Sequence, residues 1–575
     1  MKGWRVNLIL IFIFIFGAAI ISRLVFLQII DQEYWRALAK GQQKFFEEIS
    51  ADRGEIILKD KSGNLYTLAT NKEFQFIYLS PKEVKDKSDT AIKLSRILNL
   101  SEDFILEKLK DEESLFVVLK KQLTESEVQN IKELNSEGKQ ASYGAGLPGV
   151  YIGEEKIRYY PLGSFAAHLL GFVGGEFSGQ YGAEGFYNEI LSGEKGFIEG
   201  EKNPTGYSIL FDTNFSPAQK GDDLILTVDY NIQFLAEKLL KEAKENLEIE
   251  SGSIIITDPN SGEILALANF PSFNPNEYSK IENLDIFQNS AIQKLFEPGS
   301  VFKPITMAAG LDKEKITPQT TYHDPGMLKI DGWPIYNYDG RTYPGEITMT
   351  EVLEKSINTG AVFAEKETGH NNFLEYVKRF GFFEKTDIDL QGEIWSENKN
   401  LKSGREINYA TASFGQGIEI TPIQLVRAFS VIANGGKLVK PLVVEGSNSS
   451  LDVGGGQIIS TRTASQLQAM MVSVVENGYA KKTKIPGYYI AGKTGTAQIP
   501  WIALGIDKSG YSEKTIQSFL GFAPAFNAKF LILVKLNNPQ AKTAEYSAVP
   551  IFKELAKYII DYWHIPPDYQ VESEK

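Results

Sequence analysis

An unbroken apolar run near the N-terminus constrains this chain more than any other feature. Residues 8–21 (LILIFIFIFGAAII) contain no polar side chain, and residues 6–30 as a whole contain few. A segment of this length and composition favours a helix that crosses a membrane. A cleaved signal peptide is the alternative, but no small-residue cleavage site of the A-x-A type follows the run. The sequence therefore predicts an uncleaved transmembrane anchor over residues 6–30.

The charges on either side of this segment indicate its orientation. Lys2 and Arg5 precede it, whereas Asp31 and Glu33 follow it. Basic residues favour the cytoplasmic side of a membrane-spanning helix. We therefore expect residues 1–5 to form a short cytoplasmic tail and the rest of the chain to lie outside the cytoplasmic membrane.

Composition excludes several classes of site. The chain has no cysteine, which rules out disulfides, zinc-thiolate sites and a cysteine nucleophile. No two of its four histidines stand at metal-ligand spacing, so we expect neither a metal nor another cofactor. The net charge of −13, without a cluster of Lys and Arg, argues against a nucleic-acid partner. The histidines are His168, His323, His370 and His564.

At 575 residues the chain is too long for one hydrophobic core, so we expect more than one domain. Residues 33–48 read as a helix that leaves the membrane, residues 51–71 as a hairpin, and residues 81–136 as mostly helical. A strand followed by a long helix then begins near residue 222. We therefore place a domain boundary there, with domains over 31–221 and 222–575.

The pattern of the second domain predicts an α+β fold. Its first helix is followed by a hairpin, a largely helical block, further strands and a terminal amphipathic helix. This order suggests an antiparallel sheet with helices on its faces. The hairpin is expected at 252–270, the strands at 488–499, 516–526 and 529–538, and the last helix at 547–563.

The stretch FEPGSVFKP, residues 296–304, carries a candidate nucleophile. A serine hydroxyl needs an adjacent base, and Lys303 stands three residues after Ser300, on the same face of a helix. Lysine can accept a proton if burial or neighbouring cations lower its pKa. The motif alone is weak, because S-x-x-K also begins at Ser136, Ser192 and Ser396. Only Ser300 opens an apolar helix; the plain alternative is that Ser300 caps that helix and Lys303 is solvated.

Two further motifs follow in order. Ser356 and Asn358 form an S-x-N sequence, and Lys493, Thr494 and Gly495 form a K-T-G sequence inside a predicted strand. Gly495 would allow a ligand to approach the backbone closely. S-x-x-K, S-x-N and K-T-G in this order form a signature of penicillin-recognising serine enzymes.

These segments resemble the class B penicillin-binding proteins, which are membrane-anchored peptidoglycan D,D-transpeptidases. EPGSVFKP, KSINTG and AGKTGTAQ resemble the three active-site motifs of that family, and residues 412–441 resemble the segment before the third. DRGEIILKDKSGNLYTLA, RYYPLGSFAAHLLGFVG and GAEGFYNEILSGEKG resemble its N-terminal motifs. Gln288 departs from the arginine that members often have. The resemblance implies a penicillin-binding serine transpeptidase fold, with an elongated pedestal (dimerisation-type) domain over 31–221 and a single transmembrane helix.

The resemblance also implies a role for each motif residue. Ser300 would attack the bond between the terminal D-alanines of a stem peptide, and Lys303 would accept its proton. Ser356 would relay the proton to the leaving amine, and Asn358 would hold an amide of the donor. Lys493 would raise the local potential, and Thr494 and Thr496 would bind the substrate carboxylate beside Gly495. The oxyanion hole would consist of the backbone N–H groups of Ser300 and Thr496, and a β-lactam would acylate Ser300.

Partners and location follow from the same resemblance. It implies a single-pass protein of the bacterial cytoplasmic membrane that binds stem peptides and β-lactam antibiotics. A membrane-embedded wall glycosyltransferase and division or elongation proteins would be its partners. The segment at residues 415–436 and the modest pedestal favour the division type. An elongation-type enzyme, a catalytically silent scaffold of the division complex, and a β-lactam hydrolase or sensor stay open as alternatives.

Overall fold

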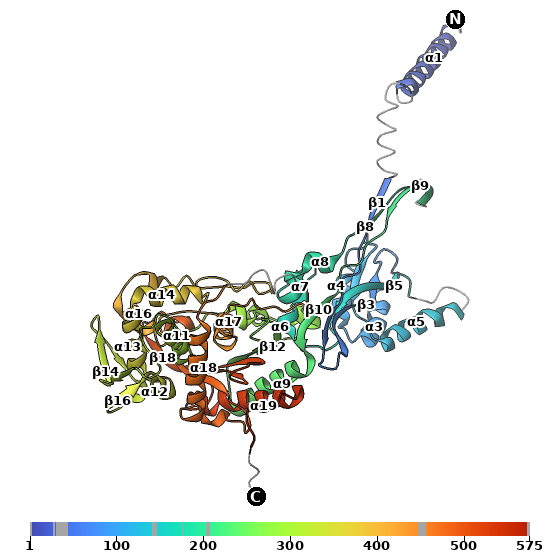
Figure 1. Ribbon diagram of the computed structural model, residues 1–575. Coiled ribbons are helices and arrows are strands. Elements are labelled where there is room, and N and C mark those ends of the chain that lie inside the picture. Colours follow the sequence, from blue (N-terminus) through green and yellow to red (C-terminus); the bar gives the residue numbers. More distant parts are fainter. Residues whose placement is uncertain are drawn as a thin grey trace. The chain divides into compact units, whose positions relative to one another are not determined.

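The computed structural model describes residues 3–26, 29, 44–140, 147–175, 177–202, 208–446 and 456–571 (Figure 1). The chain forms two compact units. One consists of Met1–Gly54 and Glu189–Asp222, and the other of Glu55–Asn188 and Asp223–Lys575.

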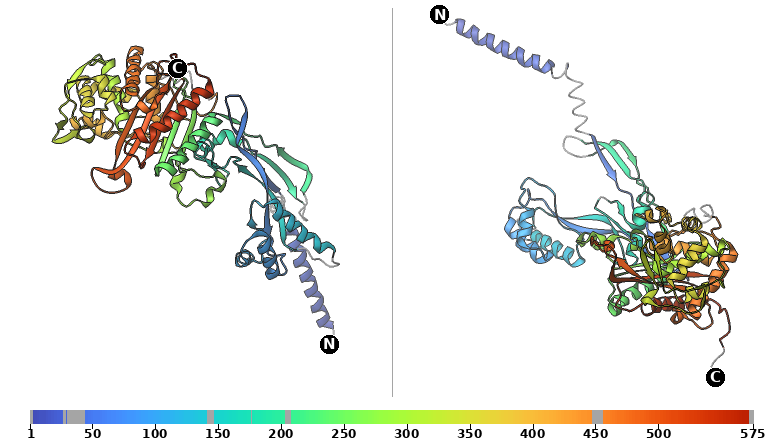
Figure 2. Two further views of the ribbon diagram at one scale, coloured as in Figure 1. Left: turned by 90° about the horizontal axis from the view of Figure 1, so that it is seen from below. Right: turned by 90° about the vertical axis from the view of Figure 1, so that its left-hand side faces the viewer.

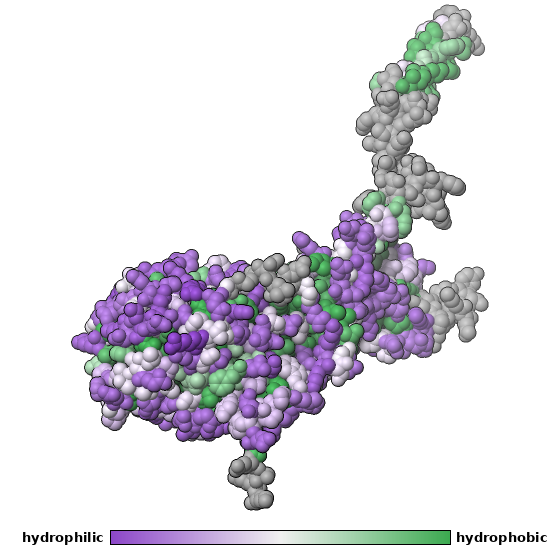
Figure 3. All heavy atoms as spheres, in the orientation of Figure 1, coloured by the Kyte–Doolittle hydropathy of each residue, from purple (hydrophilic) through white to green (hydrophobic). Residues whose placement is uncertain are grey.

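The predicted anchor is a helix. Helix α1 runs from Gly3 to Val25, and its stretch Leu8–Val25 is long and apolar enough to cross a membrane. No residue of this stretch is buried, and its side chains form the green, hydrophobic surface of the N-terminal helix in Figure 3. Most of residues 27–30, the end of the predicted span, lie outside the described residues.

The first unit also contains a small antiparallel sheet in the order β1-β8-β9. Strand β1 (Lys44–Ile49) pairs with β8 (Gly196–Lys202), which pairs with β9 (Ser208–Ser216). The expectation of a helix over 33–48 was therefore wrong for residues 44–48; residues 33–43 lie outside the described part of the chain. A partner strand about 150 residues away decides the conformation here, because pairing across a sheet overrides a weak local helix preference.

The N-terminal part of the second unit is built on a five-stranded sheet in the order β10-β2-β3-β4, with β5 paired to β3. The predicted hairpin is confirmed, because β2 and β3 pair antiparallel across the turn at Asp60–Asn64. Helices α3, α4 and α5 share an apolar core with this sheet. The bounds are β2 Ile56–Lys59, β3 Leu65–Leu79, β4 Val117–Lys120, β5 Val150–Tyr159, β10 Leu224–Asp229, α3 Lys87–Leu98, α4 Glu102–Lys108 and α5 Glu125–Gln140.

Two strands of this region, β4 and β5, were missed by the sequence analysis. Residues 81–136 were predicted to be mostly helical, but β4 separates α4 from α5 and pairs with the end of β3. Only four residues long, β4 is too short to show a clear alternation of apolar and polar side chains. Helix α4 is capped by Ser101, whose hydroxyl accepts a hydrogen bond from Phe104 N.

The C-terminal part of the second unit is an α+β domain around an antiparallel sheet, in the order β12-β11-β19-β18-β17. The predicted hairpin and the three later strands are all confirmed as members of this sheet. Strand β17 lies at one edge, so one side of its backbone is available to other groups. The bounds are β11 Ser251–Thr257, β12 Ile264–Phe270, β17 Ala491–Pro500, β18 Tyr511–Ala523 and β19 Phe530–Asn537.

Helices cover both faces of this sheet (Figure 2). Helices α9 (Tyr230–Leu247) and α19 (Ala548–Trp563) pack on one face, where Phe519 of β18 meets Phe552 of α19. Helices α17 (Pro422–Ala433) and α18 (Thr461–Glu476) pack on the other, together with the segment that contains Ser300. The candidate site therefore lies on the face opposite α9 and α19, at the β17 edge.

The remaining elements of the second unit are short segments and the helices of the block between β12 and β17. The short ones are α6 Ala167–Leu170, β6 Phe172–Val173, β7 Gly179–Gln180, α7 Gly182–Phe186, η2 Pro275–Lys280, η3 Leu284–Phe287, α10 Ser290–Gln293, β13 Thr321–His323, β14 Met327–Ile330, β15 Trp333–Tyr336, η5 Tyr338–Gly340, β16 Glu346–Thr348, α15 Lys399–Lys402, η6 Lys481–Thr483, η7 Trp501–Leu504 and η8 Ala544–Tyr546. The helices are α11 Lys303–Asp312, α12 Met349–Glu354, α13 Asn358–Thr368, α14 His370–Arg379 and α16 Glu406–Ala412. Helix α8 (Asn188–Ser192) stands where the chain passes into the first unit.

Candidate active site

Ser300 lies in a tight turn that leads into helix α11. The 3-10 turn η4 (Gly299–Phe302) continues directly into α11, and Pro304 stands in its first turn, where a missing N–H does no harm. Gly299 has φ +60°, and its N–H donates to the carbonyl of Gly415 at 2.9 Å. Gly415 has φ +80°, and a Cβ there would lie 2.1 Å from the oxygen of Gly299. The turn that contains Ser300 thus depends on a direct contact between two backbones.

The two members of the S-x-x-K motif differ in their surroundings. Ser300 is half-buried, and its hydroxyl has no hydrogen-bond partner among the described residues. Lys303 is fully buried, and its Nζ donates to the carbonyl of Ser356 at 2.5 Å and to Oδ1 of Asn358 at 2.8 Å. Ser356 Oγ lies 3.3 Å from the same nitrogen. Lys303 thus joins the first motif to the second, and a direct Ser300–Lys303 hydrogen bond is not among its contacts.

The S-x-N motif connects two helices. Ser356 follows α12 and has φ +54°, a left-handed conformation that is rare for a residue with a side chain. Asn358 is the first residue of α13. The turn between the helices brings the hydroxyl and carbonyl of Ser356 and the amide of Asn358 to the same nitrogen, Nζ of Lys303.

Lys493 completes this cluster from strand β17. Its Nζ donates to Ser356 Oγ at 2.9 Å and to the carbonyl of Thr494 at 3.0 Å, and its side chain is almost wholly buried. Burial lowers the pKa of Lys493 to about 7. Burial, and then the charge of Lys493, lowers the pKa of Lys303 well below its ordinary value of 10.5. A neutral lysine is therefore available in this cluster near neutral pH.

Strand β17 lies against the turn that contains Ser300. A Cβ at Gly495 would stand 2.7 Å from Ser518 Oγ, 3.0 Å from Val301 Cγ1 and 3.2 Å from the carbonyl oxygen of Pro298, so only glycine allows this approach. Thr494 is buried, and Thr496 is half-buried, its Oγ1 accepting a hydrogen bond from Ala544 N at 3.4 Å. The structure thus places the K-T-G segment beside the turn of Ser300, as the sequence order predicted. Within the described residues, no group of three His, Cys, Asp or Glu could hold a metal ion.

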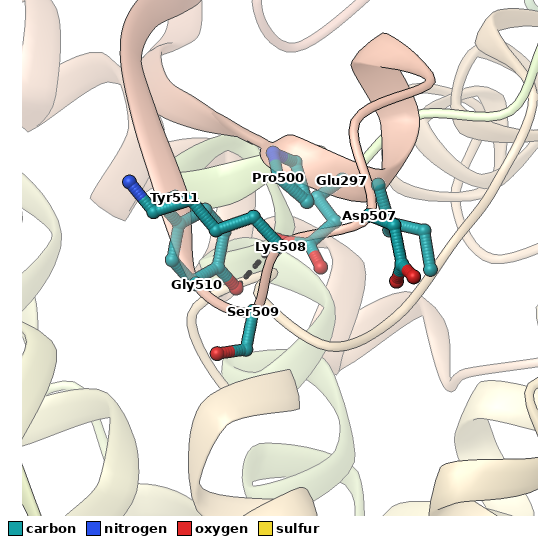
Figure 4. Close-up of a pocket in the computed structure, with 8 residues that line it drawn as sticks. Glu297, Pro500, Asp507, Lys508, Ser509, Gly510 and Tyr511 are labelled. Carbon is teal, nitrogen blue, oxygen red and sulfur yellow. Dashed lines mark hydrogen bonds between the residues drawn. The ribbon is translucent and has the colours of Figure 1, made fainter.

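A pocket of about 350 Å³ lies next to this site and includes a carboxylate that the sequence analysis did not single out (Figure 4). Glu297 stands three residues before Ser300, and its side chain accepts hydrogen bonds from Tyr511 Oη at 2.9 Å and Gly417 N at 3.0 Å. Burial raises the pKa of Glu297 to about 7. Its position directly before Pro298 and Gly299 was the one signal in the sequence. The other lining residues are Pro500, Ile502, Asp507, Lys508, Ser509, Gly510 and Tyr511.

Comparisons with known proteins define the class of this chain. Residues 252–557 match the penicillin-binding protein transpeptidase domain, and residues 48–226 match the penicillin-binding protein dimerisation domain. The chain therefore belongs to the class B penicillin-binding proteins and is an enzyme of the transpeptidase class, which confirms the resemblance noted in its motifs.

Particular relatives span most of the chain. Stage V sporulation protein D of Bacillus subtilis is 31% identical, over 92% of this chain and 82% of its own length. The peptidoglycan D,D-transpeptidase FtsI of Escherichia coli K12 is 30% identical, over 100% of this chain and 94% of its own length. The crystal structure of penicillin-binding protein 2X from Streptococcus thermophilus has the same fold, with a TM-score of 0.68, 22% identity, and coverage of 91% of this chain and 81% of that one.

Proposed function

We propose that this chain is a peptidoglycan D,D-transpeptidase that works through a serine acyl-enzyme on Ser300. The observation that carries the proposal is the hydrogen-bonded cluster of Lys303, Ser356, Asn358 and Lys493 beside the Ser300 turn. The name of the relative FtsI, a peptidoglycan D,D-transpeptidase, supports the substrate class.

The contacts of Lys303 support its role as the base. A neutral amine has two hydrogens and one lone pair. The carbonyl of Ser356 and Oδ1 of Asn358 can only accept, so each takes one of the two hydrogens. The lone pair of neutral Lys303 then faces the remaining direction, where a hydroxyl can donate. Ser300 lies one helical turn before Lys303, and a bound substrate would bring the two together.

The proposed first step is acylation. Ser300 Oγ bonds to the carbonyl carbon between the two terminal D-alanines of a stem peptide, and its proton passes to Lys303 Nζ. The C–N bond then breaks, the leaving amine takes a proton through Ser356, and D-alanine departs. In the second step an amino group of a neighbouring stem attacks the ester, which releases Ser300 and forms the cross-link. The 3.3 Å separation of Lys303 Nζ and Ser356 Oγ suits the relay of that proton.

The other motif residues act on binding and charge in this proposal. Asn358 holds a backbone amide of the donor stem. Lys493 helps to keep Lys303 neutral and attracts the terminal carboxylate, which Thr494 and Thr496 bind beside Gly495. The backbone N–H groups of Ser300 and Thr496 receive the negative charge that develops on the carbonyl oxygen, and each such donor is worth about 3–4 kcal/mol in comparable enzymes.

In the cell we infer a role in septal wall synthesis. The segment at residues 415–436 and the modest pedestal, which resemble the division type, support this role over elongation. We place residues 1–5 in the cytoplasm, α1 in the cytoplasmic membrane, and the domains over 31–221 and 222–575 outside it, as a pedestal and a transpeptidase domain. A membrane-embedded wall glycosyltransferase and other division proteins are the expected partners. Filamentous cells on depletion would support this role, and round cells would point to elongation instead.

The first test is covalent labelling of the full-length chain in detergent with a fluorescent penicillin, followed by peptide mass mapping. We expect one adduct, on Ser300, and none in Ser300→Ala. Ser396→Ala is a matched control, because Ser396 begins a rival S-x-x-K motif and its hydroxyl donates to Glu419 at 3.4 Å, with no described hydrogen bond to the cluster. It should label as the wild type does. A folded wild-type protein without an adduct would contradict the proposal and favour a silent scaffold, and rapid release of the adduct would favour a hydrolase.

A further inference from the structure

Helix α13, which begins at Asn358, receives its N-terminal cap from a distant loop. Its N-cap residue, Ile357, has no polar side chain, so the first N–H groups of the helix need another partner. That partner is Asn337, whose Oδ1 accepts hydrogen bonds from Asn358 N at 3.0 Å and from Thr359 N at 3.1 Å. Asn337 is only 3% exposed, so these bonds are shielded from solvent. The start of the S-x-N helix is thus fixed by a residue about 20 positions earlier.

Asn337 is in turn held by a carboxylate. Its Nδ2 donates to Oδ1 of Asp324 at 3.1 Å, to Oδ2 of Asp324 at 2.9 Å and to the carbonyl of Arg341 at 3.1 Å. Asp324 also accepts from the hydroxyl of Thr359 at 2.7 Å and from the backbone of Tyr343 at 2.9 Å. Because Asp324 can only accept, the amide of Asn337 must direct Nδ2 towards it and Oδ1 towards α13.

The residue before Asn337 fixes the side chain of Asn358. Nδ2 of Asn358 donates to the carbonyl of Tyr336 at 2.9 Å. A carbonyl cannot donate, so this bond sets the rotation of the Asn358 amide and leaves Oδ1 facing Lys303 Nζ, at 2.8 Å. Two consecutive residues, Tyr336 and Asn337, therefore hold Asn358 by its side chain and its backbone.

We propose that Asn337, oriented by Asp324, is a positioning residue of the active site. Through the backbone N–H of Asn358 it sets where that residue stands, while the carbonyl of Tyr336 sets the rotation of its side-chain amide. The position of Asn358 Oδ1 in turn sets the direction in which the Lys303 lone pair points. Neither Asn337 nor Asp324 contacts Lys303 or Ser300 among the bonds described, so the effect passes through Asn358. This inference rests on the proposed function, because it concerns the base of that reaction.

The test separates the acylation rate from initial binding. The full-length chain in detergent is mixed with a fluorescent penicillin over a range of concentrations, which yields the acylation rate constant and the dissociation constant of the complex that precedes it. For Asn337→Ala we expect the rate constant to fall by about 100-fold, as a misplaced reacting group does, with the dissociation constant little changed. Tyr322→Phe is the matched control, because it removes a hydroxyl that contacts Thr359 at 3.2 Å in the same network but leaves both bonds of Asn337 to α13 in place. It should lower the thermal midpoint of unfolding while acylation stays at the wild-type rate.

A second experiment exchanges the side chains of Asn337 and Asp324, and it keeps the inference testable if Asn337→Ala fails to fold. Asn337→Asp puts a second carboxylate next to Asp324 and should slow acylation. In the double variant Asp324→Asn with Asn337→Asp, the new amide at position 324 can donate to the new carboxylate at position 337. We expect this variant to recover most of the acylation rate. A folded Asn337→Ala that acylates at the wild-type rate would overturn the inference, as would a folded double variant no faster than Asn337→Asp, or an equal loss of rate in Tyr322→Phe. A wild-type chain without an adduct on Ser300 would instead remove the proposed function, and this inference with it.

Discussion

Lys303 and Lys493 converge on one hydroxyl, since Ser356 Oγ lies 3.3 Å from Nζ of the first and 2.9 Å from Nζ of the second. Both amines are buried, and neither forms an ion pair within the described residues. Two ammonium groups in such a place would repel each other and lack solvation, so the site favours a state in which at least one lysine is neutral. The proposed role of Lys303 as the base requires that its amine be the neutral one. The first two predictions test this requirement.

Removal of the proposed base should nearly abolish acylation. For Lys303→Ala we expect the rate of β-lactam acylation to fall by about 1,000-fold, because the variant lacks the amine that we propose accepts the proton of Ser300. Stopped-flow labelling with a fluorescent penicillin measures the rate. Lys313→Ala is the control, since Lys313 directly follows the same helix and contacts Glu375 at 3.2 Å on its outer side. Acylation of Lys303→Ala at the normal rate would exclude Lys303 as the base.

Removal of the second lysine should shift the pH dependence. The charge of Lys493 helps to lower the pKa of Lys303, so Lys493→Ala should raise that pKa and leave Lys303 more fully protonated at neutral pH. Because the neutral amine is the base, the acid limb of the acylation-rate profile should move to higher pH. The profile of each protein is measured from acidic to alkaline pH. A fall in rate by the same factor at every pH would show that Lys493 does not act on the titration of Lys303.

An added methyl group at Gly495 should push β17 away from the turn that contains Ser300. For Gly495→Ala the new Cβ would lie within 3.2 Å of Ser518, Val301 and Pro298, so the strand must shift. We expect a loss of about 1–3 kcal/mol in the free energy of unfolding, and slower acylation. Denaturant unfolding and labelling measure the two effects. Gly510→Ala is the control for acylation, because nothing lies within 4 Å of a Cβ there, although its φ of +89° will cost some stability. Unchanged acylation in Gly495→Ala would show that the close approach is dispensable.

A third buried lysine makes folding stability depend on pH. Lys535 of β19 donates to Asn537 Oδ1 at 2.8 Å and lies over the ring of Phe296, and burial lowers its pKa to about 7. Between that value and its ordinary 10.5 the unfolded chain binds more protons than the folded one, so stability rises with pH over this range. Lys535→Met should therefore be more stable at pH 7, by on the order of 2 kcal/mol, with a shallower rise towards alkaline pH. Urea unfolding at several pH values measures both. A Met variant that is less stable at neutral pH would contradict the expectation.

The sequence predicted the elements of the catalytic sheet well, because local patterns decide them. The turn at Asp258–Gly262 and the run of β-branched residues in β11 identify the first hairpin. Strands β1, β4 and β5 could not be found this way, since each is defined by a partner far along the chain. All three lie outside the sheet that contains β17.

The sequence yields candidate residues for the site, but it does not give their contacts. The motifs named Ser300, Lys303, Ser356, Asn358 and Lys493, yet no spacing rule shows that Lys303 bonds to residues 53 and 55 positions later. Asn337 could not be identified from the sequence for a similar reason. It stands in the sequence NYDG, which reads as an ordinary turn, and its importance arises from α13, which only the folded chain brings beside it.

The contact between Gly299 and Gly415 also limits how this protein can change over generations. Most neighbouring residues in a core can drift together, because a larger side chain at one position is offset by a smaller one at the other. Here both partners already have no side chain, and each has a positive φ. A replacement at either glycine has no compensating replacement at the other. If β-lactams acylate Ser300 as proposed, we therefore expect resistance substitutions to arise at other positions and to spare this pair.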